Sequence, residues 1–372
     1  MGETIFALNA NEFPKPCQSA LERMQEPWDP QLAPLRSSLL FELAGAKKED
    51  LFVFTSSGAE AVTQVLLSLF LEVSRKEGKC HFVTSLLEDA ATLHMMKRLE
   101  ELGCYVKIAP LNSRGEIDVL KLADLLNPRT ALISVSMAQG LTGVIQPVEQ
   151  IAQLAHSKGI RLHLDANYAL GKYAFSFEEL QADYLTFSGD QIHSVPGSGG
   201  LFAKEGAPLV PLILGGGLRG GSFDGPSFLA LCSAAQQSLL SLDRMALEVA
   251  RLRDLFESEV LRQIPEAAVL FQDSLRLPNT SALYLPRVHQ EALQYFLQRN
   301  KLYSSIGGTA SPHLHRLIAA AGLGEIAPFS SMSFSFSRMT TEEEVVKSAA
   351  LLASTLDDLQ SISRGIFYAA PE

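Results

Sequence analysis

The residues best suited to chemistry stand directly after two apolar runs that read as buried strands. Asp165 follows the run Arg161–Leu164, and Ser188 follows the run Tyr184–Phe187. The carboxyl ends of neighbouring parallel strands meet at one edge of an open α/β sheet, which is where such sheets bind ligands. Asp165 is therefore well positioned to contact a ligand. A surface acid at a loop mouth is the alternative for Asp165, and an ordinary loop-starting residue is the alternative for Ser188.

A third feature is the turn between the run Leu51–Thr55 and a helix that we expect to open near Glu60. The small residues Ser57, Gly58 and Ala59 fill this turn. Backbone N–H groups and the positive end of a helix dipole converge at such a point, which suits an anion. The pattern predicts a phosphate cradle, and a tight turn that merely needs small residues is the alternative.

Seven β-rich runs alternate with helical patterns over the first 250 residues. Several are apolar on both faces, which is typical of a parallel sheet covered by helices on both sides. The predicted fold class is α/β, with a large domain built on a mostly parallel seven-stranded sheet between helices. The predicted strands are Leu51–Thr55, His81–Thr84, Tyr105–Ile108, Ala131–Ser136, Arg161–Leu164, Tyr184–Phe187 and Gly200–Ala203. A helix is predicted over Gln146–Gly159, with Pro147 in its first turn.

The pattern changes after the glycines at 215–217, which predicts a second, smaller α+β domain. Pro226–Ile264 reads as a helical stretch, plausibly two helices, and strands are expected at Thr280–Leu285 and Ser331–Phe336. Thr341 and Glu344 form a capping box for a C-terminal helix. We expect an N-terminal arm at 1–15, the large domain at 16–250 and the small domain at 251–372.

Composition narrows the classes of function. The chain has 372 residues, 47% of them hydrophobic, and a formal net charge of −10. Acidic proteins without basic runs do not neutralise nucleic-acid phosphates, so nucleic acid is excluded as a partner. The longest apolar stretch, Val65–Val73, is too short to span a bilayer. The expectation is a cytoplasmic protein that contacts no membrane.

The four cysteines, at positions 17, 80, 104 and 232, show no close pairing. Their spacing predicts neither a metal site nor a disulfide framework. Cys80 and Cys104 start predicted strands and are expected to be buried thiols.

The chain resembles the cysteine desulfurases of the class V aminotransferase superfamily, which bind pyridoxal phosphate on the type I fold. The resemblance rests on the strand-end residues Asp165 and Ser188 and on several segments in the family's order. These segments are Phe54–Ala61, Leu111–Asp118, Thr142–Pro147 and Ser331–Arg338.

The resemblance implies a set of contacts to pyridoxal phosphate. Asp165 would pair with the pyridine nitrogen, Ser188 would face the cofactor, and the turn at Ser57, Gly58 and Ala59 would hold the phosphate. Tyr168 stands where the family has a glutamine. Its side chain could replace the contact that the family's ring-stacking histidine makes with the cofactor ring. Arg219 and Ser222 would reach the phosphate across a dimer interface, so the resemblance also implies a homodimer.

The reactive positions of the family are different in this chain. Gln191 stands at the position of the lysine that forms a Schiff base, and an amide cannot form one. Asp89 stands at the position of the ring-stacking histidine, and Ala310 at that of the catalytic cysteine. The nearest lysines along the chain, Lys172 and Lys204, belong to other elements, so either would need a rearranged loop to take the missing role.

Two hypotheses for function follow from the sequence. The first is a catalytically silent homologue with a binding or regulatory role, whose candidate partners are sulfur-transfer or iron–sulfur assembly proteins. The second is an active enzyme, a desulfurase or a related amino-acid lyase or transferase, that holds pyridoxal phosphate without a covalent bond.

Overall fold

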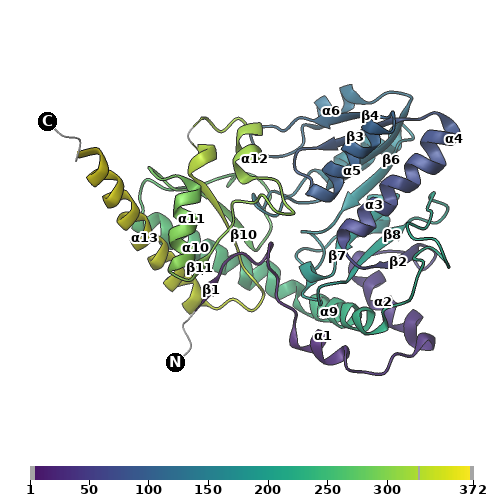
Figure 1. Cartoon of the computed structure of the whole chain (residues 1–372), viewed down its shortest axis with the longest axis horizontal. Helices are drawn as coiled ribbons and strands as arrows, with labels where there is room; N and C mark the ends of the chain where they lie inside the picture. Colours follow the sequence, from purple (N-terminus) through teal and green to yellow (C-terminus); the bar gives the residue numbers. More distant parts are fainter. Residues whose placement is uncertain (1–4, 326, 369–372) are drawn as a thin grey trace.

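The large body of the molecule is built on a seven-stranded sheet. The computed structural model describes residues 5–325 and 327–368 of the chain. Figure 1 shows the large body joined to a smaller one by a long helical run. The sheet contains, in spatial order, β2 (Leu51–Thr55), β8 (Gly199–Ala203), β7 (Tyr184–Ser188), β6 (Arg161–Asp165), β5 (Thr130–Ser136), β3 (His81–Ser85) and β4 (Tyr105–Ala109). Only β8 runs antiparallel to its neighbours, so the other strands end at one shared edge.

The predicted α/β class and the mostly parallel sheet are confirmed, and each predicted strand matches an observed one to within one residue at either end. The reason is that inner strands such as β3 and β5 are buried along their whole length, so apolar and β-branched residues predominate in them. Neighbouring residues of one strand enter different cores, as Leu132 and Ile133 do on the two faces of β5.

Helices cover both faces of this sheet. Residues of α3 (Gly58–Leu69) and α5 (Ala90–Glu101) pack on one face. Residues of α1 (Gln18–Arg23), α2 (Ala33–Ala44), α6 (Val119–Leu125), α7 (Val148–Ser157), α8 (Phe177–Leu180) and α9 (Gly225–Arg244) pack on the other. The prediction for α7 is confirmed in its core, but Pro147 occupies the N-cap and not the first turn.

The predicted helical stretch between the two bodies is confirmed, and it contains two α-helices that follow each other without a loop. α9 passes through a π-helical turn, η4 (Met245–Val249), into α10 (Ala250–Gln263). A second π-helical turn, η2 (Phe70–Ser74), joins α3 to the short α4 (Arg75–Glu77). A π turn inserts a residue without a glycine or proline, so the sequence carries no signal of it.

The smaller body is an α+β unit that includes β1, near the beginning of the described residues. Its antiparallel sheet has the order β12-β10-β9, and β1 pairs with β11 in a separate parallel ladder. The strands are β1 (Phe6–Ala7), β9 (Ala268–Val269), β10 (Thr280–Tyr284), β11 (Leu302–Tyr303) and β12 (Ser331–Ser335). The helices that follow are α11 (Gln290–Arg299), α12 (Leu314–Ala320) and α13 (Glu342–Tyr368), and the buried side chains of α12 join the core of the large body. Of the short 3-10 turns, η1 (Pro30–Leu32) and η3 (Asp190–Ile192) lie in the large body and η5 (Ala327–Ser330) directly precedes β12. The capping box forms as predicted, since Glu344 N donates to Thr341 Oγ1 at 3.3 Å and Thr341 N donates back to Glu344 Oε2 at 2.8 Å.

Two further expectations can be compared with the described residues. No helix in the described ranges is long and apolar enough to cross a membrane. Cys104 is buried as predicted, whereas Cys80 is only partly buried, so that part of the prediction is wrong. Cys80 precedes β3 and its Sγ accepts a hydrogen bond from Arg129, which keeps it near the surface.

Candidate functional site

A cavity of about 360 Å³ lies at the shared carboxyl edge of the large sheet. This volume is within the range of roughly 300–1,000 Å³ that small-molecule sites occupy. Six of the residues proposed to contact a cofactor line it: Ser57, Gly58, Ala59, Asp165, Tyr168 and Ser188. The three positions that differ from the family's reactive residues, Asp89, Gln191 and Ala310, line it as well.

The remaining two predicted residues, Arg219 and Ser222, do not reach the cavity within one chain. The Arg219 guanidinium lies 5.3 Å from the ring centre of Phe54 and 5.5 Å from that of Phe223. It also donates to the carbonyl oxygen of Ser222. Within this chain the Arg219 guanidinium therefore contacts two aromatic rings and a carbonyl oxygen of its own loop.

The turn before α3 is a self-capped helix start. Ser57 is the N-cap and accepts a hydrogen bond from Glu60 N at 3.2 Å, while Glu60 Oε2 accepts one from Ser56 N at 2.6 Å. The N–H groups of Gly58 and Ala59 are the first of the helix and have no partner among the described residues. Two backbone donors thus remain for a ligand, with a glutamate carboxylate beside them.

Close packing fixes this turn against the sheet. A Cβ on Gly199 would lie 2.6 Å from the carbonyl carbon of Ser57, and one on Gly58 would lie 3.2 Å from Ser188 Cβ. Glycine is needed at 199 because a backbone approaches it this closely. The glycine-rich loop therefore serves the packing of the turn, and Gly199 itself lies inside β8.

Asp165 and Asn167 connect the strand ends beneath the cavity. Asp165 is only 6% exposed, so it is not a surface acid at a loop mouth. Its Oδ1 accepts from Asn167 N at 3.0 Å. The Asn167 side chain accepts from Ser188 N at 3.2 Å and donates to Asp89 Oδ2 at 3.0 Å. Sequence reasoning missed Asn167, which orders three of the cavity residues at once.

Tyr168 forms a wall of the cavity together with the loop that carries Ala310. The Tyr168 hydroxyl lies 2.8 Å from Ser311 Oγ and donates to Asp89 Oδ1 at 3.3 Å. Ala310 O accepts from Ala90 N at 2.7 Å, which ties this loop to the start of α5. The Tyr168 ring packs directly against Gly140, where a Cβ would lie 2.5 Å from a ring carbon.

Three carboxyl groups lie close together here, and each has a raised pKa. Burial raises the pKa of Glu88 to about 7 and that of Asp89 to about 6, against opposing hydrogen bonds from Ser85, Ser136, Asn167 and Tyr168. Burial and then repulsion by Asp89 and Glu88 raise the pKa of Asp165 well above its ordinary value. The titratable groups that interact with Asp89 include Glu88, Asp165 and Lys172.

Gln191, on η3, is engaged by hydrogen bonds at both ends of its amide. Its Oε1 accepts from Lys172 Nζ at 3.0 Å, and its Nε2 donates to Asn11 O at 2.8 Å. Lys172 Nζ also donates to Asn11 Oδ1 at 3.1 Å, and Asn279 Nδ2 donates to the same oxygen at 3.0 Å. Through the bond to Asn11, the buried amide of Gln191 joins the N-terminal arm to the large body.

The position of Lys172 is a finding that sequence reasoning missed. We expected its use to need a rearranged loop, yet the observed loop already brings the amine to Gln191. Lys172 does not line the cavity. Burial lowers the pKa of its ammonium to about 7, against the attraction of Asp190 and Asp89. Lys204 lies elsewhere, in a separate hollow with Asp183.

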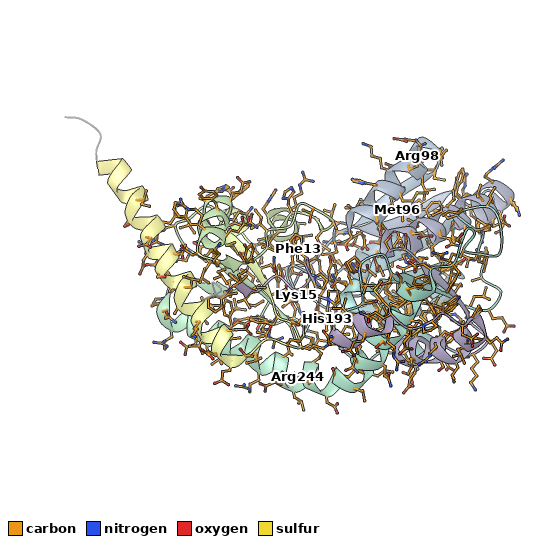
Figure 2. All side chains as sticks on the ribbon, turned by 60° about the horizontal axis from the view of Figure 1, so that its bottom comes forward. Phe13, Lys15, Met96, Arg98, His193 and Arg244 are labelled. Atoms are coloured by element: carbon orange, nitrogen blue, oxygen red, sulfur yellow. The ribbon has the colours of Figure 1, made fainter. Side chains whose placement is uncertain are left out.

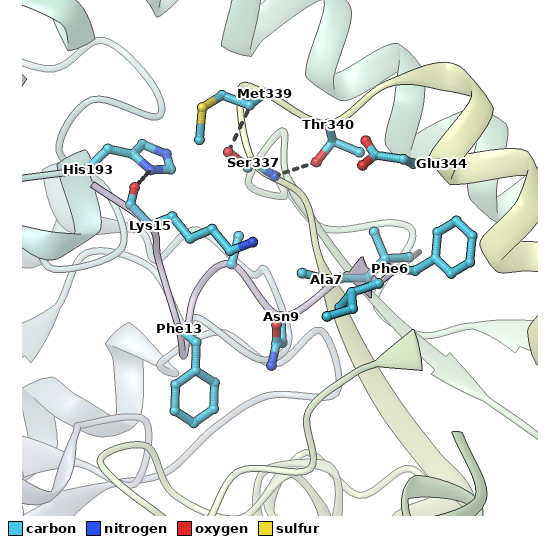
Figure 3. Close-up of a pocket in the computed structure, with 13 residues that line it drawn as sticks. Phe6, Ala7, Asn9, Phe13, Lys15, His193, Ser337, Met339, Thr340 and Glu344 are labelled. Atoms are coloured by element: carbon cyan, nitrogen blue, oxygen red, sulfur yellow. Dashed lines mark hydrogen bonds between the residues drawn. The ribbon is translucent and has the colours of Figure 1, made fainter. Parts of the chain in front are cut away.

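The arm that supplies Asn11 and Glu12 to the cavity also borders a second, smaller hollow. Figure 3 shows Lys15 extending into this hollow from the side of His193, opposite Thr340 and Glu344. His193 Nδ1 donates to Lys15 O at 2.8 Å, and Figure 2 places these residues at the junction of the two bodies. Burial lowers the pKa of His193 to about 4, so the neutral ring holds the arm.

Comparisons with known proteins identify the family. A family model described as aminotransferase class-V matches residues 38–347. The cysteine desulfurase of Cereibacter sphaeroides is 34% identical over 87% of this chain and 84% of its own length. Cysteine desulfurase 2 of Trichormus variabilis is 32% identical over 86% of this chain and 81% of its own.

The chain belongs to the class V aminotransferase family, among the cysteine desulfurases. A solved structure called a NifS-like protein agrees with this class V fold at a TM-score of 0.86 and 25% identity, covering 96% of this chain and 99% of that one. A second, from Rickettsia africae, has a TM-score of 0.84 at 18% identity and shows the fold alone.

This class V family implies pyridoxal phosphate as cofactor, and the cavity residues fit only part of it. Asp165 and the open N–H groups of Gly58 and Ala59 suit the pyridine nitrogen and a phosphate oxygen. An aldehyde finds no amine on the cavity wall, since Gln191 is an amide. A phosphate, with close to two negative charges, finds no lysine, arginine or histidine among the described lining residues. Within a single chain, the lining residues therefore fit only part of the cofactor.

Proposed function

We propose that this chain is a catalytically silent member of the cysteine desulfurase family, with a binding or regulatory role. The observation that carries the proposal is Gln191, a buried amide on the cavity wall whose oxygen and nitrogen are both engaged within the protein. An amide nitrogen is not a nucleophile toward an aldehyde. Its neighbour Lys172 lies outside the cavity lining.

The loop at residues 307–311 adds support. It lines the cavity at Thr309, Ala310 and Ser311, and no cysteine occurs after Cys232 in the chain. Where the resemblance implies an arginine for a substrate carboxylate, β12 carries Ser333–Ser335. Loss of one acid or base group typically costs about 10²- to 10⁴-fold in rate, and here several roles lack a residue together.

A desulfurase assay tests this proposal directly. The purified full chain is incubated with pyridoxal phosphate, cysteine and a thiol, and sulfide and alanine are measured. The cysteine desulfurase of Cereibacter sphaeroides serves as the positive control. We expect no turnover. Multiple turnovers of alanine per chain would contradict the proposal.

The alternative is an active enzyme that holds pyridoxal phosphate without a covalent bond. Asp165 favours it, because its buried carboxyl group lines the same cavity as the open end of α3. An absorption spectrum with added cofactor, taken for the natural protein and for Asp165→Ala, separates the two. A bound-cofactor band that is lost in Asp165→Ala supports the alternative, and the absence of any bound band eliminates it.

We also propose that the chain forms a homodimer and binds sulfur-transfer or iron–sulfur assembly proteins. The segment before α9 exposes several apolar side chains, among them Ile213, Leu214 and Phe223. Such a patch is typical of a protein interface. Equilibrium sedimentation is expected to show a dimer, and a monomer at all concentrations would contradict this part of the proposal.

A further inference from the structure

Two of the four cysteines lie side by side at the amino edge of the large sheet, away from the cavity. Cys80 directly precedes β3 and Cys104 directly precedes β4. These parallel strands align His81 with Tyr105, and Tyr105 N donates to Cys80 O at 2.8 Å. Neighbouring strands lie about 4.7–4.9 Å apart. This spacing is within the Cα separation of roughly 4.4–6.8 Å that a disulfide spans.

Both cysteine side chains face the same core. Residues two apart on a strand share a face. Phe82 and Val106, the aligned pair two residues further on, pack into the core beneath α3 and α5, and so do Cys80 and Cys104. Burial raises the pKa of the Cys104 thiol, and Cys80 acts in the same direction, so the two sulfurs are close enough to interact. Both are free thiols.

Cys80 is the sulfur that an oxidant reaches first. It is only partly buried, whereas Cys104 is 7% exposed. Arg129 Nη2 donates to Cys80 Sγ at 3.0 Å and is held in place by Gly78 O at 3.4 Å. The thiolate is the nucleophilic form of cysteine, and reactive cysteines lie in partly exposed places beside a cation. This arrangement suits Cys80 as the attacking sulfur and Cys104 as its partner.

We propose that Cys80 and Cys104 form a reversible disulfide, with a peroxide as the oxidant. The Cys80 thiolate attacks one oxygen of hydrogen peroxide, the O–O bond breaks, and hydroxide leaves a sulfenic acid on Cys80. The Cys104 sulfur then forms the S–S bond as the S–O bond breaks and water leaves. In total, two thiols lose two protons and two electrons, and the peroxide becomes two water molecules. This inference goes beyond the proposed function and does not rest on it.

The disulfide would join the two ends of a segment that borders the cavity. The closed loop contains β3 and α5, and Ala90 and Ala91 at the start of α5 line the cavity. β4 lies at the end of the strand order and pairs with β3 alone among the described strands. Oxidation therefore fastens an edge strand and restrains one wall of the cavity.

Peptide mapping of the full chain tests the pairing. The reduced protein is treated with equimolar hydrogen peroxide, alkylated with iodoacetamide and digested with trypsin without a reductant. Cleavage after Lys79, Lys97, Arg98 and Lys107 places the two cysteines in separate peptides, residues 80–97 and 99–107. We expect these peptides to be linked, two hydrogens lighter than their sum, and separated again by dithiothreitol. Alkylation of both cysteines, or Cys80 linked to Cys80 of a second chain, would overturn the proposal.

Substitutions test the order of the two steps. Cys104→Ser should stop at the sulfenic acid, which dimedone labels on Cys80, whereas Cys80→Ser should react with neither peroxide nor dimedone at Cys104. Cys17→Ser, which removes a different buried thiol, is the control and should still form the linked peptide. A linked or dimedone-labelled Cys104 in Cys80→Ser would contradict the assigned roles, and this variant changes a partly exposed residue if Cys104→Ser fails to fold.

Two further measurements concern Arg129 and the fit of the disulfide. Arg129→Gln should slow thiol loss severalfold, whereas Arg98→Gln, which removes an exposed arginine on α5, should not. Equal rates in both variants would remove Arg129 from the proposal. The oxidised chain should unfold at a higher urea concentration than the reduced chain, because the link restricts the unfolded state. A lower midpoint would mean that the link distorts the strands, which contradicts the proposal. Desulfurase activity bears only on the proposed function, since the link forms with or without it.

Discussion

Replacing Lys172 with methionine should change how stability depends on pH. Burial lowers the pKa of Lys172 from its ordinary 10.5 to about 7. Between these values the unfolded chain binds a proton that the folded chain does not, so the free energy of unfolding rises with pH. The slope from one such group is about 1.4 kcal/mol per pH unit. Below about pH 7 both states hold the proton, and the slope vanishes.

The magnitude can be read as a difference between the natural protein and Lys172→Met. From pH 7.5 to 9.5 the natural protein should gain roughly 2–3 kcal/mol relative to the variant. Loss of the hydrogen bonds to Asn11 and Gln191 adds a constant offset, which leaves the slope unchanged. Subtracting the stability curve of Lys172→Met from that of the natural protein removes the contribution of every other titrating group.

Urea unfolding at a series of pH values measures this difference. Trp28 is the single tryptophan and packs on Phe223 and Phe228, so its fluorescence reports the large body. Lys97→Met, which removes an exposed lysine on α5, provides the correction for a general change in charge. Parallel stability curves for the natural protein and Lys172→Met over this range would refute the reasoning, because they would mean that Lys172 stays protonated in the folded state.

Two other outcomes are expected. Arg276→Met should lower the free energy of unfolding by about 3–5 kcal/mol, because it leaves the Glu257 carboxylate buried and unpaired. The two side chains are 10% and 11% exposed, and Arg276 Nη1 lies 2.5 Å from Glu257 Oε1. An unchanged midpoint of urea unfolding would contradict this prediction. Gly140→Ala should cost about 1–3 kcal/mol and alter the near-ultraviolet circular dichroism of Tyr168, since the new methyl carbon would overlap its ring.

The large sheet could be predicted from the sequence because its inner strands are buried on both faces. Such strands are rich in apolar and β-branched residues, and β3 and β5, which are buried at every position, combine these with a few serine, threonine and histidine side chains. The site residues Asp165 and Ser188 follow from the same pattern, since each stands at the end of a recognisable strand. Strand ends and turns are local features that a sequence displays directly.

The parts that could not be predicted depend on contacts between distant segments. Asn11 donates through Nδ2 to Gly140 O at 2.7 Å and to Thr280 Oγ1 at 2.8 Å, across sequence separations of 129 and 269 residues. No local pattern marks it as part of a cavity. The contact between Lys172 and Gln191 likewise depends on how two loops turn back toward each other, which composition does not record.

The N-terminal arm makes the cavity a late product of translation. The large sheet is complete once residue 203 has emerged from the ribosome, since β8 is its last strand to be made. Asn11, however, needs Ser335 Oγ, 324 residues further on, to receive its backbone N–H. A nascent chain can therefore hold a finished sheet whose ligand pocket still lacks one wall, and a ligand added at that stage would meet an open trough.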